Sequence, residues 1–505
     1  MMKEQNRKSW IFSTLLSVLF LSLLWTAGCA RSPLPDSESY QAVETSAETG
    51  ASENAGVSSD PVEVQDAFDA FTDRVFCDLL EGDPLSIHFV LQNPENYGLT
   101  ATEMKFPEIS LDALLEDTRE NTELRTELES FDSSLLTSDQ LFTYKLLKDA
   151  LETEDLCRGL EQYYQPLSPL IGTQAQLPTL LAEYTFYDKE DIEQYLELLS
   201  QIDVYFDQLA NYEKERARAG LAPSDATIDR ILQSCKDYLI RPENSFLTET
   251  FASRLDEVPG LSAEEKEEYK KQHLTILKEH FIPAYTNLSA ALEELKGSCT
   301  GDGSLSSYEK GKEYYAYLVA SETGTDSSVD ELRQRIEKRM GADMAAMARL
   351  LNDNPSLEKR LASASISLSD PVEILNHLQE QIKEDFPELK DTSFEVKHVP
   401  QALEASLSPA FFLVPPLDYE GPNVIYINDE ASREQNLYTM LAHEGYPGHL
   451  YQSVYFNRKN RCPLHRLLTC GGYSEGWGLY CELYSYSFDN GLPEDVQQIL
   501  MYNEA

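Results

Sequence analysis

The sequence predicts a mainly α-helical protein with one small β-sheet, which directly precedes the most informative motif in the chain. Across residues 63–390, apolar side chains recur every three or four positions, the repeat of helices that bury one face. After Lys390, short runs rich in β-branched and aromatic residues appear instead. With 505 residues, the chain is long enough to bury a large core.

Residues 1–28 have the features of an export signal. Basic residues at the start precede an uncharged apolar run from Trp10 to Leu24, and a small-residue site ends in Cys29. This ending resembles the signal of bacterial lipoproteins, in which the cysteine is lipidated and becomes the first residue. We therefore expect a lipid anchor on Cys29 and a location on the extracytoplasmic face of the cell membrane. A plain secretory signal and an uncleaved anchor helix are the alternatives.

Residues 29–62, the lipidated cysteine and the segment after it, are rich in Ser, Glu, Ala and Pro and predict a disordered acidic linker.

The charge of the chain restricts its partners. The whole chain has 87 acidic and 41 basic residues, a net charge of −46. Such a polyanion repels phosphate groups, which excludes nucleic acid as a partner and leaves the lipid anchor as the expected membrane contact.

Within residues 63–390, three segments have the clearest helical periodicity. The apolar positions from Ile192 to Leu209 predict one long helix, and the Glu- and Lys-rich run from Ala263 to Lys296 predicts another. A third helix is expected over 329–351, after the cap candidates Ser327 and Ser328. Residues 391–505 are expected to form the small sheet, from runs at 394–399, 411–414 and 424–427, and the helices that follow it.

The segment from Leu441 to Gln452 contains residue types typical of zinc hydrolases. His443 and His449 are candidate metal ligands, and Glu444 is a candidate for activating a water molecule. Six residues separate the two histidines, which on a regular helix is a turn of about 240° and prevents a shared metal ion. Gly445, Pro447 and Gly448 predict a break in the helix that could restore the site. Without such a break, two buried histidines with structural roles are the simpler interpretation.

A third ligand is available in the segment from Tyr473 to Glu482. Glu475 and Glu482 are seven residues apart, two turns along one face of a helix. This arrangement suits one metal-binding carboxylate and one carboxylate that accepts a hydrogen bond from a ligand imidazole. Taken alone, the pair favours the simpler interpretation of two surface glutamates on either side of a buried Trp477.

Together these residues resemble a bacterial family called domain of unknown function 885. The resemblance rests on the pattern His443-Glu444 to Pro447-Gly448-His449, on Glu475-Gly476-Trp477 to Glu482, and on the segments 408–412 and 423–428. That family is similar in turn to gluzincin metallopeptidases. The resemblance implies a gluzincin-like helical domain and one zinc ion per chain, held by His443, His449 and Glu475. It also implies that Glu444 is the general base, and Glu482 remains the expected carboxylate that orients a ligand.

The same resemblance suggests residues that contact substrate. In gluzincins an exposed edge strand pairs with the substrate backbone, and Val424 to Asn428 is the candidate for it here; an interior strand of the sheet is the alternative. Asn423 and Tyr426 at this strand, with Tyr446 inside the motif, are the candidate substrate-binding residues.

These features predict a membrane-anchored, zinc-dependent metallopeptidase that acts on peptides. A peptide-binding lipoprotein that has lost catalysis is one alternative, and a hydrolase of non-peptide amides or esters is another. The helical pattern at Val496 to Leu500 has no stop signal, so we expect the domain to be truncated at its C-terminal end.

Overall fold

The computed structural model describes residues 60–99, 103–169, 171–399, 404, 407–434, 436–459 and 462–504. The expected signal at 1–28, the anchor cysteine Cys29 and the linker up to residue 59 lie outside these ranges. Within them, the protein is mainly helical with one three-stranded sheet, which confirms the predicted fold class.

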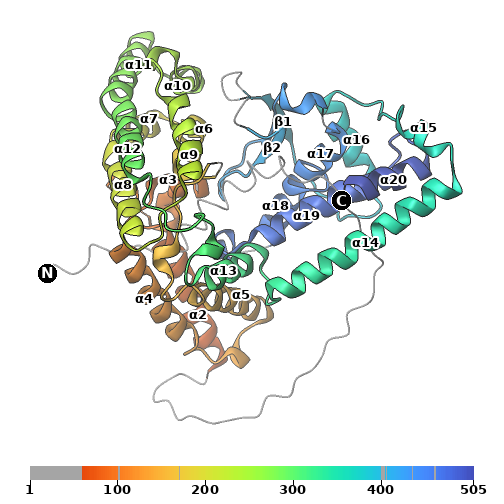
Figure 1. Ribbon diagram of the computed structural model, residues 1–505, viewed down its shortest axis with the longest axis horizontal. Coiled ribbons are helices and arrows are strands. Elements are labelled where there is room, and N and C mark those ends of the chain that lie inside the picture. Colours follow the sequence, from red (N-terminus) through yellow and green to blue (C-terminus); the bar gives the residue numbers. More distant parts are fainter. Residues whose placement is uncertain are drawn as a thin grey trace.

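Three of the four N-terminal helices gather at one end of the molecule, and the second of the four lies between them and the next group (Figure 1). Asp60 caps the first of them by accepting a hydrogen bond from the Val62 N–H, and Thr137 with Gln140 forms a capping box on the fourth. Their apolar faces share a core that also receives Leu464 and Leu467 from the C-terminal part of the chain. The helices are α2 (Pro61–Leu80), α3 (Pro84–Val90), α4 (Leu111–Leu128) and α5 (Ser138–Asp155).

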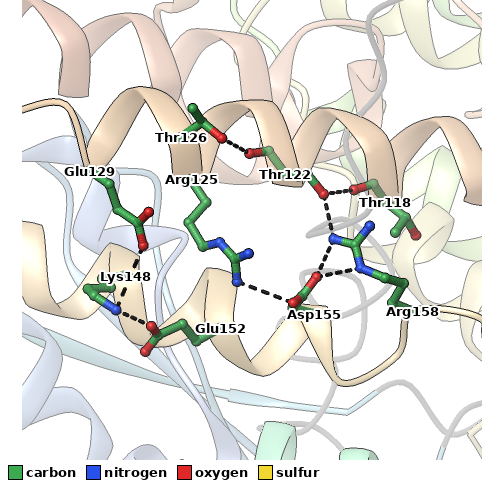
Figure 2. A network of polar contacts seen from close by, with 9 residues as sticks. All are labelled: Thr118, Thr122, Arg125, Thr126, Glu129, Lys148, Glu152, Asp155 and Arg158. Atoms are coloured by element: carbon green, nitrogen blue, oxygen red, sulfur yellow. Dashed lines mark hydrogen bonds and ion pairs between the residues drawn. The ribbon is translucent and has the colours of Figure 1, made fainter. Parts of the chain in front are cut away.

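A polar seam joins α4 and α5 on the outside of this group (Figure 2). The Asp155 carboxylate accepts from Arg125 at 3.2 Å and from Arg158 at 2.8 Å, and Arg158 also donates to the Thr122 hydroxyl at 2.6 Å. Exposed ion pairs of this kind contribute about 0–1 kcal/mol each. The buried apolar side chains therefore supply most of the stability here, and the seam fixes how the two helices align.

A second group of helices packs around a large aromatic core that contains Tyr195, Phe206, Phe251 and Tyr285. In Figure 1 these helices stand together on one side of the molecule. They are α6 (Thr173–Glu183), α7 (Lys189–Leu199), α8 (Ile202–Arg218), α9 (Asp225–Tyr238), α10 (Phe246–Glu257), α11 (Ala263–Ile276) and α12 (Ile282–Leu295).

Two predicted helices of this group differ in detail from the structure. The stripe from Ile192 to Leu209 is buried as expected, but it belongs to two helices, α7 and α8, rather than one. The Ser200 hydroxyl donates to the Glu197 carbonyl at 2.6 Å, a local bond that competes with helix continuation. The run from Ala263 onward is helical as predicted, with a π-helical turn over Leu277–Phe281. That wider turn precedes Pro283, which has no N–H to donate.

The next helices lead from this group to the sheet. They are α13 (Gly311–Thr323), α14 (Val329–Asp353), α15 (Leu357–Leu361) and α16 (Pro371–Gln381). Ser328 caps α14 in a capping box with Glu331, as its sequence position predicted. The apolar stripe of α14 is only partly covered, since Ile336 and Met344 are exposed.

The sheet lies between the aromatic core and the last helices. Its strands are β1 (Phe394–His398), β2 (Ala410–Leu413) and β3 (Asn423–Ile427), in the order β1-β3-β2, with β1 parallel and β2 antiparallel to β3. Phe411 and Tyr426 pack on one face against the aromatic core. Phe412 and Ile425 pack on the other face with side chains of α16 and of α17 (Leu437–Glu444).

The C-terminal helices gather beside the sheet (Figure 1). They are α17 (Leu437–Glu444), α18 (His449–Lys459), α19 (Gly471–Tyr484) and α20 (Glu494–Glu504). In the part of the chain that the structure describes, no helix is both long enough and apolar enough to span a bilayer.

Candidate metal centre

The predicted break between His443 and His449 is present. Helix α17 ends at Glu444 and α18 begins at His449, with the Tyr446–Pro447 peptide bond in the cis form between them. A β-carbon on residue 448 would lie 1.6 Å from the His443 carbonyl oxygen, so only glycine allows the chain to turn this closely. The turn brings the two imidazole rings to a centroid distance of 4.6 Å, at 83° to each other.

Glu475 of α19 completes a set of three converging side chains. One carboxylate oxygen lies 3.6 Å from His443 Nε2, and the other lies 3.6 Å from His449 Nε2. Two ligand atoms of a tetrahedral zinc ion, each about 2.0–2.2 Å from the metal, lie roughly 3.3–3.6 Å apart. The observed distances are therefore close to those of a zinc site.

Both Nε2 atoms are buried without a hydrogen-bond partner among the described residues. Buried polar atoms normally have partners, because leaving one unpaired costs about 1–3 kcal/mol. Two buried imidazole nitrogens that face one carboxylate are the arrangement expected of metal ligands. The donor set of two nitrogens and one oxygen also fits the preferences of Zn²⁺.

Glu482 orients His443 from the opposite side of the ring. Its Oε2 lies 3.2 Å from His443 Nδ1, so an Nδ1–H donates to Glu482 and Nε2 faces the site. Burial lowers the pKa of His443, but the facing carboxylates of Glu475 and Glu482 outweigh burial and raise that pKa to about 10. Burial raises the pKa of Glu475, but the facing imidazoles of His443 and His449 outweigh burial and lower it to about 2.

Glu444 is 1% exposed and belongs to the same cluster as the two histidines, whose candidate ligand atoms all lie within 4.8 Å of one another. Its Oε2 accepts a hydrogen bond from the Phe412 N–H of strand β2 at 3.0 Å. Burial raises the pKa of this carboxyl group. The structure thus provides a carboxylate of increased basicity with one oxygen held by the sheet.

Two further contacts in the centre have no signal in the sequence motif. Gly478 of α19 lies against the His443 ring, where a β-carbon would come within 2.5 Å of Nε2. Behind the ligands, the Thr439 hydroxyl donates to Glu504 at 2.7 Å, and Glu504 in turn bonds Tyr486. These partners are distant in sequence, and only the packing of α17, α19 and α20 brings them together.

The family model described as "Bacterial protein of unknown function (DUF885)" matches residues 94–504. The chain belongs to the DUF885 family. This confirms the family resemblance of the motifs, and the family name itself assigns no activity.

Solved structures similar to this DUF885 chain support the same fold. A crystal structure from Colwellia psychrerythraea, described as a "putative lipoprotein", aligns with a TM-score of 0.72 at 17% identity. A Shewanella oneidensis structure, described in the same words and as of unknown function, aligns with a TM-score of 0.52 at 16% identity. Each alignment covers 86% of this chain and 80% of the other. The search of curated proteins gave no match.

The strand expected to pair with substrate in this DUF885 protein is not an edge strand. β3 is the central strand, hydrogen-bonded to β1 on one side and β2 on the other, so the prediction of an exposed edge at 424–428 is wrong. Adjacent segments in sequence need not be adjacent in a sheet, and the crossover from β1 places β3 in the middle. The strand that contacts the centre is β2, through Phe412.

The three candidate substrate-binding residues make other contacts. The Asn423 amide donates to the Ser393 carbonyl at 3.1 Å. Tyr426 stacks on Phe411 at 4.8 Å, on the sheet face that packs against the aromatic core. Tyr446 is buried among apolar side chains in the core beneath α17. In these positions the three residues support the sheet and the turn.

Proposed function

We propose that this DUF885 protein is a zinc-dependent metallopeptidase of gluzincin type that is anchored to the outer face of the cell membrane by a lipid. The observation that supports this most strongly is the pair of buried Nε2 atoms, each without a hydrogen-bond partner among the described residues and each 3.6 Å from a different oxygen of Glu475. His443, His449 and Glu475 would hold one zinc ion per chain.

The chain's own residues have separate roles in this proposal. When bound, zinc would polarise a substrate carbonyl and make a water molecule more acidic. Glu482 keeps the Nδ1 proton of His443, so that Nε2 offers its lone pair. The Glu444 oxygen that is not bonded to the Phe412 N–H accepts a proton from the attacking water. Glu444 then transfers this proton to the leaving amine.

The raised pKa of Glu444 supports its role as the base. A carboxylate of ordinary pKa binds a proton weakly at neutral pH, whereas a buried one accepts it more readily. The hydrogen bond from Phe412 limits this increase and fixes the orientation of the carboxylate. Glu444 therefore combines higher basicity with a defined position.

The experiment that tests the metal site is metal analysis by mass spectrometry of the protein from residue 30 onward, alongside His449→Ala. We expect one zinc ion per chain in the parent protein and none in the variant. A well-folded parent that binds no zinc when zinc is supplied would contradict the proposal.

Hydrolysis is tested with a mixed peptide library and product detection by mass spectrometry. We expect cleavage by the zinc-loaded parent and no cleavage by Glu444→Gln, which retains the metal. Turnover by Glu444→Gln would exclude its role as the base. Peptide binding without products would favour the peptide-binding lipoprotein, and cleavage of esters or other amides alone would favour a non-peptide hydrolase.

The lipid anchor on Cys29 is supported by the signal at residues 1–28 and by the description of both structural neighbours as lipoproteins. Cells that express the full chain with labelled palmitate should label it, and Cys29→Ala should abolish the label. A labelled Cys29→Ala protein would contradict the assignment. No contact with nucleic acid is expected at a net charge of −46.

A further inference from the structure

Arg466 is a cation whose contacts with the described residues leave most of its hydrogen-bonding capacity unused. It ends a short 3₁₀ helix, Pro463–Arg466, whose neighbours Leu464 and Leu467 are buried in the core with α2. Its Nη2 donates to the carbonyls of Val414 at 3.4 Å and Pro415 at 3.3 Å. A guanidinium has five N–H donors, so two long bonds to neutral acceptors leave most of them available.

No carboxylate forms an ion pair with Arg466 among the described residues. Arg216 binds Glu213 at 2.7 Å, whereas Arg254, which also has no ion pair among the described residues, lies over the rings of Phe186 and Tyr195. Burial lowers the pKa of Arg466 to about 10. In a chain with 87 acidic and 41 basic residues, an enclosed cation without an acidic partner is unexpected unless something else supplies the negative charge. The side chain is partly accessible, so an external anion can reach it.

Strand β2 connects Arg466 to the metal centre. The Phe412 N–H holds Glu444, and two residues further along the chain the Val414 carbonyl accepts from Arg466. Residues two apart in an extended segment direct their backbone groups to the same edge, and they are separated by about 7 Å. The backbone groups that hold Glu444 and Arg466 thus belong to neighbouring positions of one stretch of chain, Phe412 in β2 and Val414 directly after the strand.

We propose that Arg466 binds a free carboxylate of the peptide substrate, so that the centre selects peptides with such a group near the bond that is cleaved. This inference rests on the proposed function. Three carboxylates, those of Glu444, Glu475 and Glu482, surround the two histidines, and one zinc ion would not neutralise them. A substrate carboxylate that binds beside them therefore needs a cation of its own nearby. A guanidinium suits this role because its parallel N–H groups match the two oxygens of a carboxylate.

The test measures binding to Glu444→Gln protein in zinc-containing buffer, which prevents turnover of the probe. Three tripeptide pools are compared: one without acidic side chains and with a free C-terminus, the same pool amidated, and an amidated pool containing Asp. Retained peptides are quantified by mass spectrometry after ultrafiltration. We expect one of the two carboxylate-bearing pools to be retained at least tenfold better than the neutral amidated pool, and which pool it is identifies the source of the carboxylate.

Introducing Arg466→Met into the Glu444→Gln protein should abolish this preference. Arg466→Lys, which retains the charge without the paired donors, should reduce it. Arg458→Met is the matched control, because Arg458 is exposed and donates to the Lys390 carbonyl from the same part of the chain. If Arg466→Met fails to fold, as judged by its melting curve, Arg466→Lys decides the result. Equal retention of all three pools, or a preference that survives both substitutions, would overturn the proposal.

The proposed function is judged separately, by cleavage in the zinc-loaded parent protein. If the protein that retains Arg466 shows no carboxylate preference but the zinc-loaded parent cleaves peptides, only the role of Arg466 is excluded. A preserved preference with no cleavage would exclude the peptidase and leave a carboxylate-binding protein.

Discussion

Gly478 lies directly against the imidazole ring of His443. A β-carbon at this position would come within 2.5 Å of Nε2, 2.7 Å of Cε1 and 2.8 Å of Cδ2. The absence of a side chain on this turn of α19 thus allows the first candidate ligand to approach the helix that carries Glu475.

Gly478→Ala should therefore displace His443 and weaken zinc binding. The new methyl group occupies the place of the ring, and Glu482 would lose its alignment with Nδ1. Loss of an orienting contact around a metal ligand typically costs about 10–100-fold in affinity, and direct displacement should cost at least as much. Zinc affinity is measured by competition with a chromophoric chelator.

Gly476→Ala provides the matched control on the same helix. A β-carbon there meets no atom within 4 Å, so the substitution should leave zinc affinity unchanged. In a helix interior it should also stabilise the fold by about 0.5–1 kcal/mol. Equal zinc affinities for the two variants would contradict the packing argument.

Glu482→Gln tests how the ligand is oriented. The amide can present its oxygen to His443 Nδ1, but it removes the negative charge that strengthens this hydrogen bond. We expect a loss of about 10–100-fold in zinc affinity, with the ligands themselves unchanged. The control is Glu313→Gln, on the exposed face of α13. An affinity equal to that of the parent would show that His443 needs no charged partner.

The sequence allowed prediction of the centre where local chemistry decides the outcome. Gly445 and Gly448 weaken a helix and Pro447 interrupts its hydrogen bonding, so together they predicted a break, and the structure has one there. The spacing of Glu475 and Glu482 predicted a shared helix face, and both contact His443. The mainly helical fold followed from periodicity in the same way.

Features that depend on long-range packing could not be predicted. The order β1-β3-β2 is decided by which strands meet in space, so β3 was expected at an edge and lies in the middle. The bond from Phe412 to Glu444 links residues 32 positions apart, and no motif marks it. Likewise, nothing in the apolar stripe from Ile192 to Leu209 indicated that it divides between α7 and α8.

Glu154→Gln should stabilise the protein at alkaline pH. Glu154 is buried, accepts from the Tyr317 hydroxyl, and its pKa is raised by burial to about 7. Between its ordinary pKa of 4.5 and about 7, the unfolded chain releases this proton and the folded protein keeps it, so the free energy of unfolding falls as pH rises. The amide has no such proton to lose.

At about pH 8 we expect the Glu154→Gln variant to exceed the parent by up to about 3 kcal/mol, with a much smaller difference near pH 5. Urea unfolding at both pH values measures this. Glu152→Gln, on the same helix but exposed, should show no comparable pH dependence. A constant difference between Glu154→Gln and the parent at both pH values would exclude a role for Glu154 titration.

Trp477 should report zinc binding directly. It is the only tryptophan after residue 30, it lies two residues after Glu475, and its Nε1 donates to the Pro447 carbonyl in the turn at 2.9 Å. Glu475 lies two residues before Trp477, and His449 lies two residues after Pro447, so a metal ion bound to both lies near both ends of this contact. We therefore expect a saturable change in tryptophan emission on zinc titration of the protein from residue 30 onward.

Zinc should also raise the melting temperature, since a ligand at 1,000 times its Kd adds about 4 kcal/mol to the free energy of unfolding. Magnesium should produce neither effect, because it prefers all-oxygen sites. His449→Ala removes a ligand without touching the tryptophan, so a parental response from that variant would show that zinc binds elsewhere.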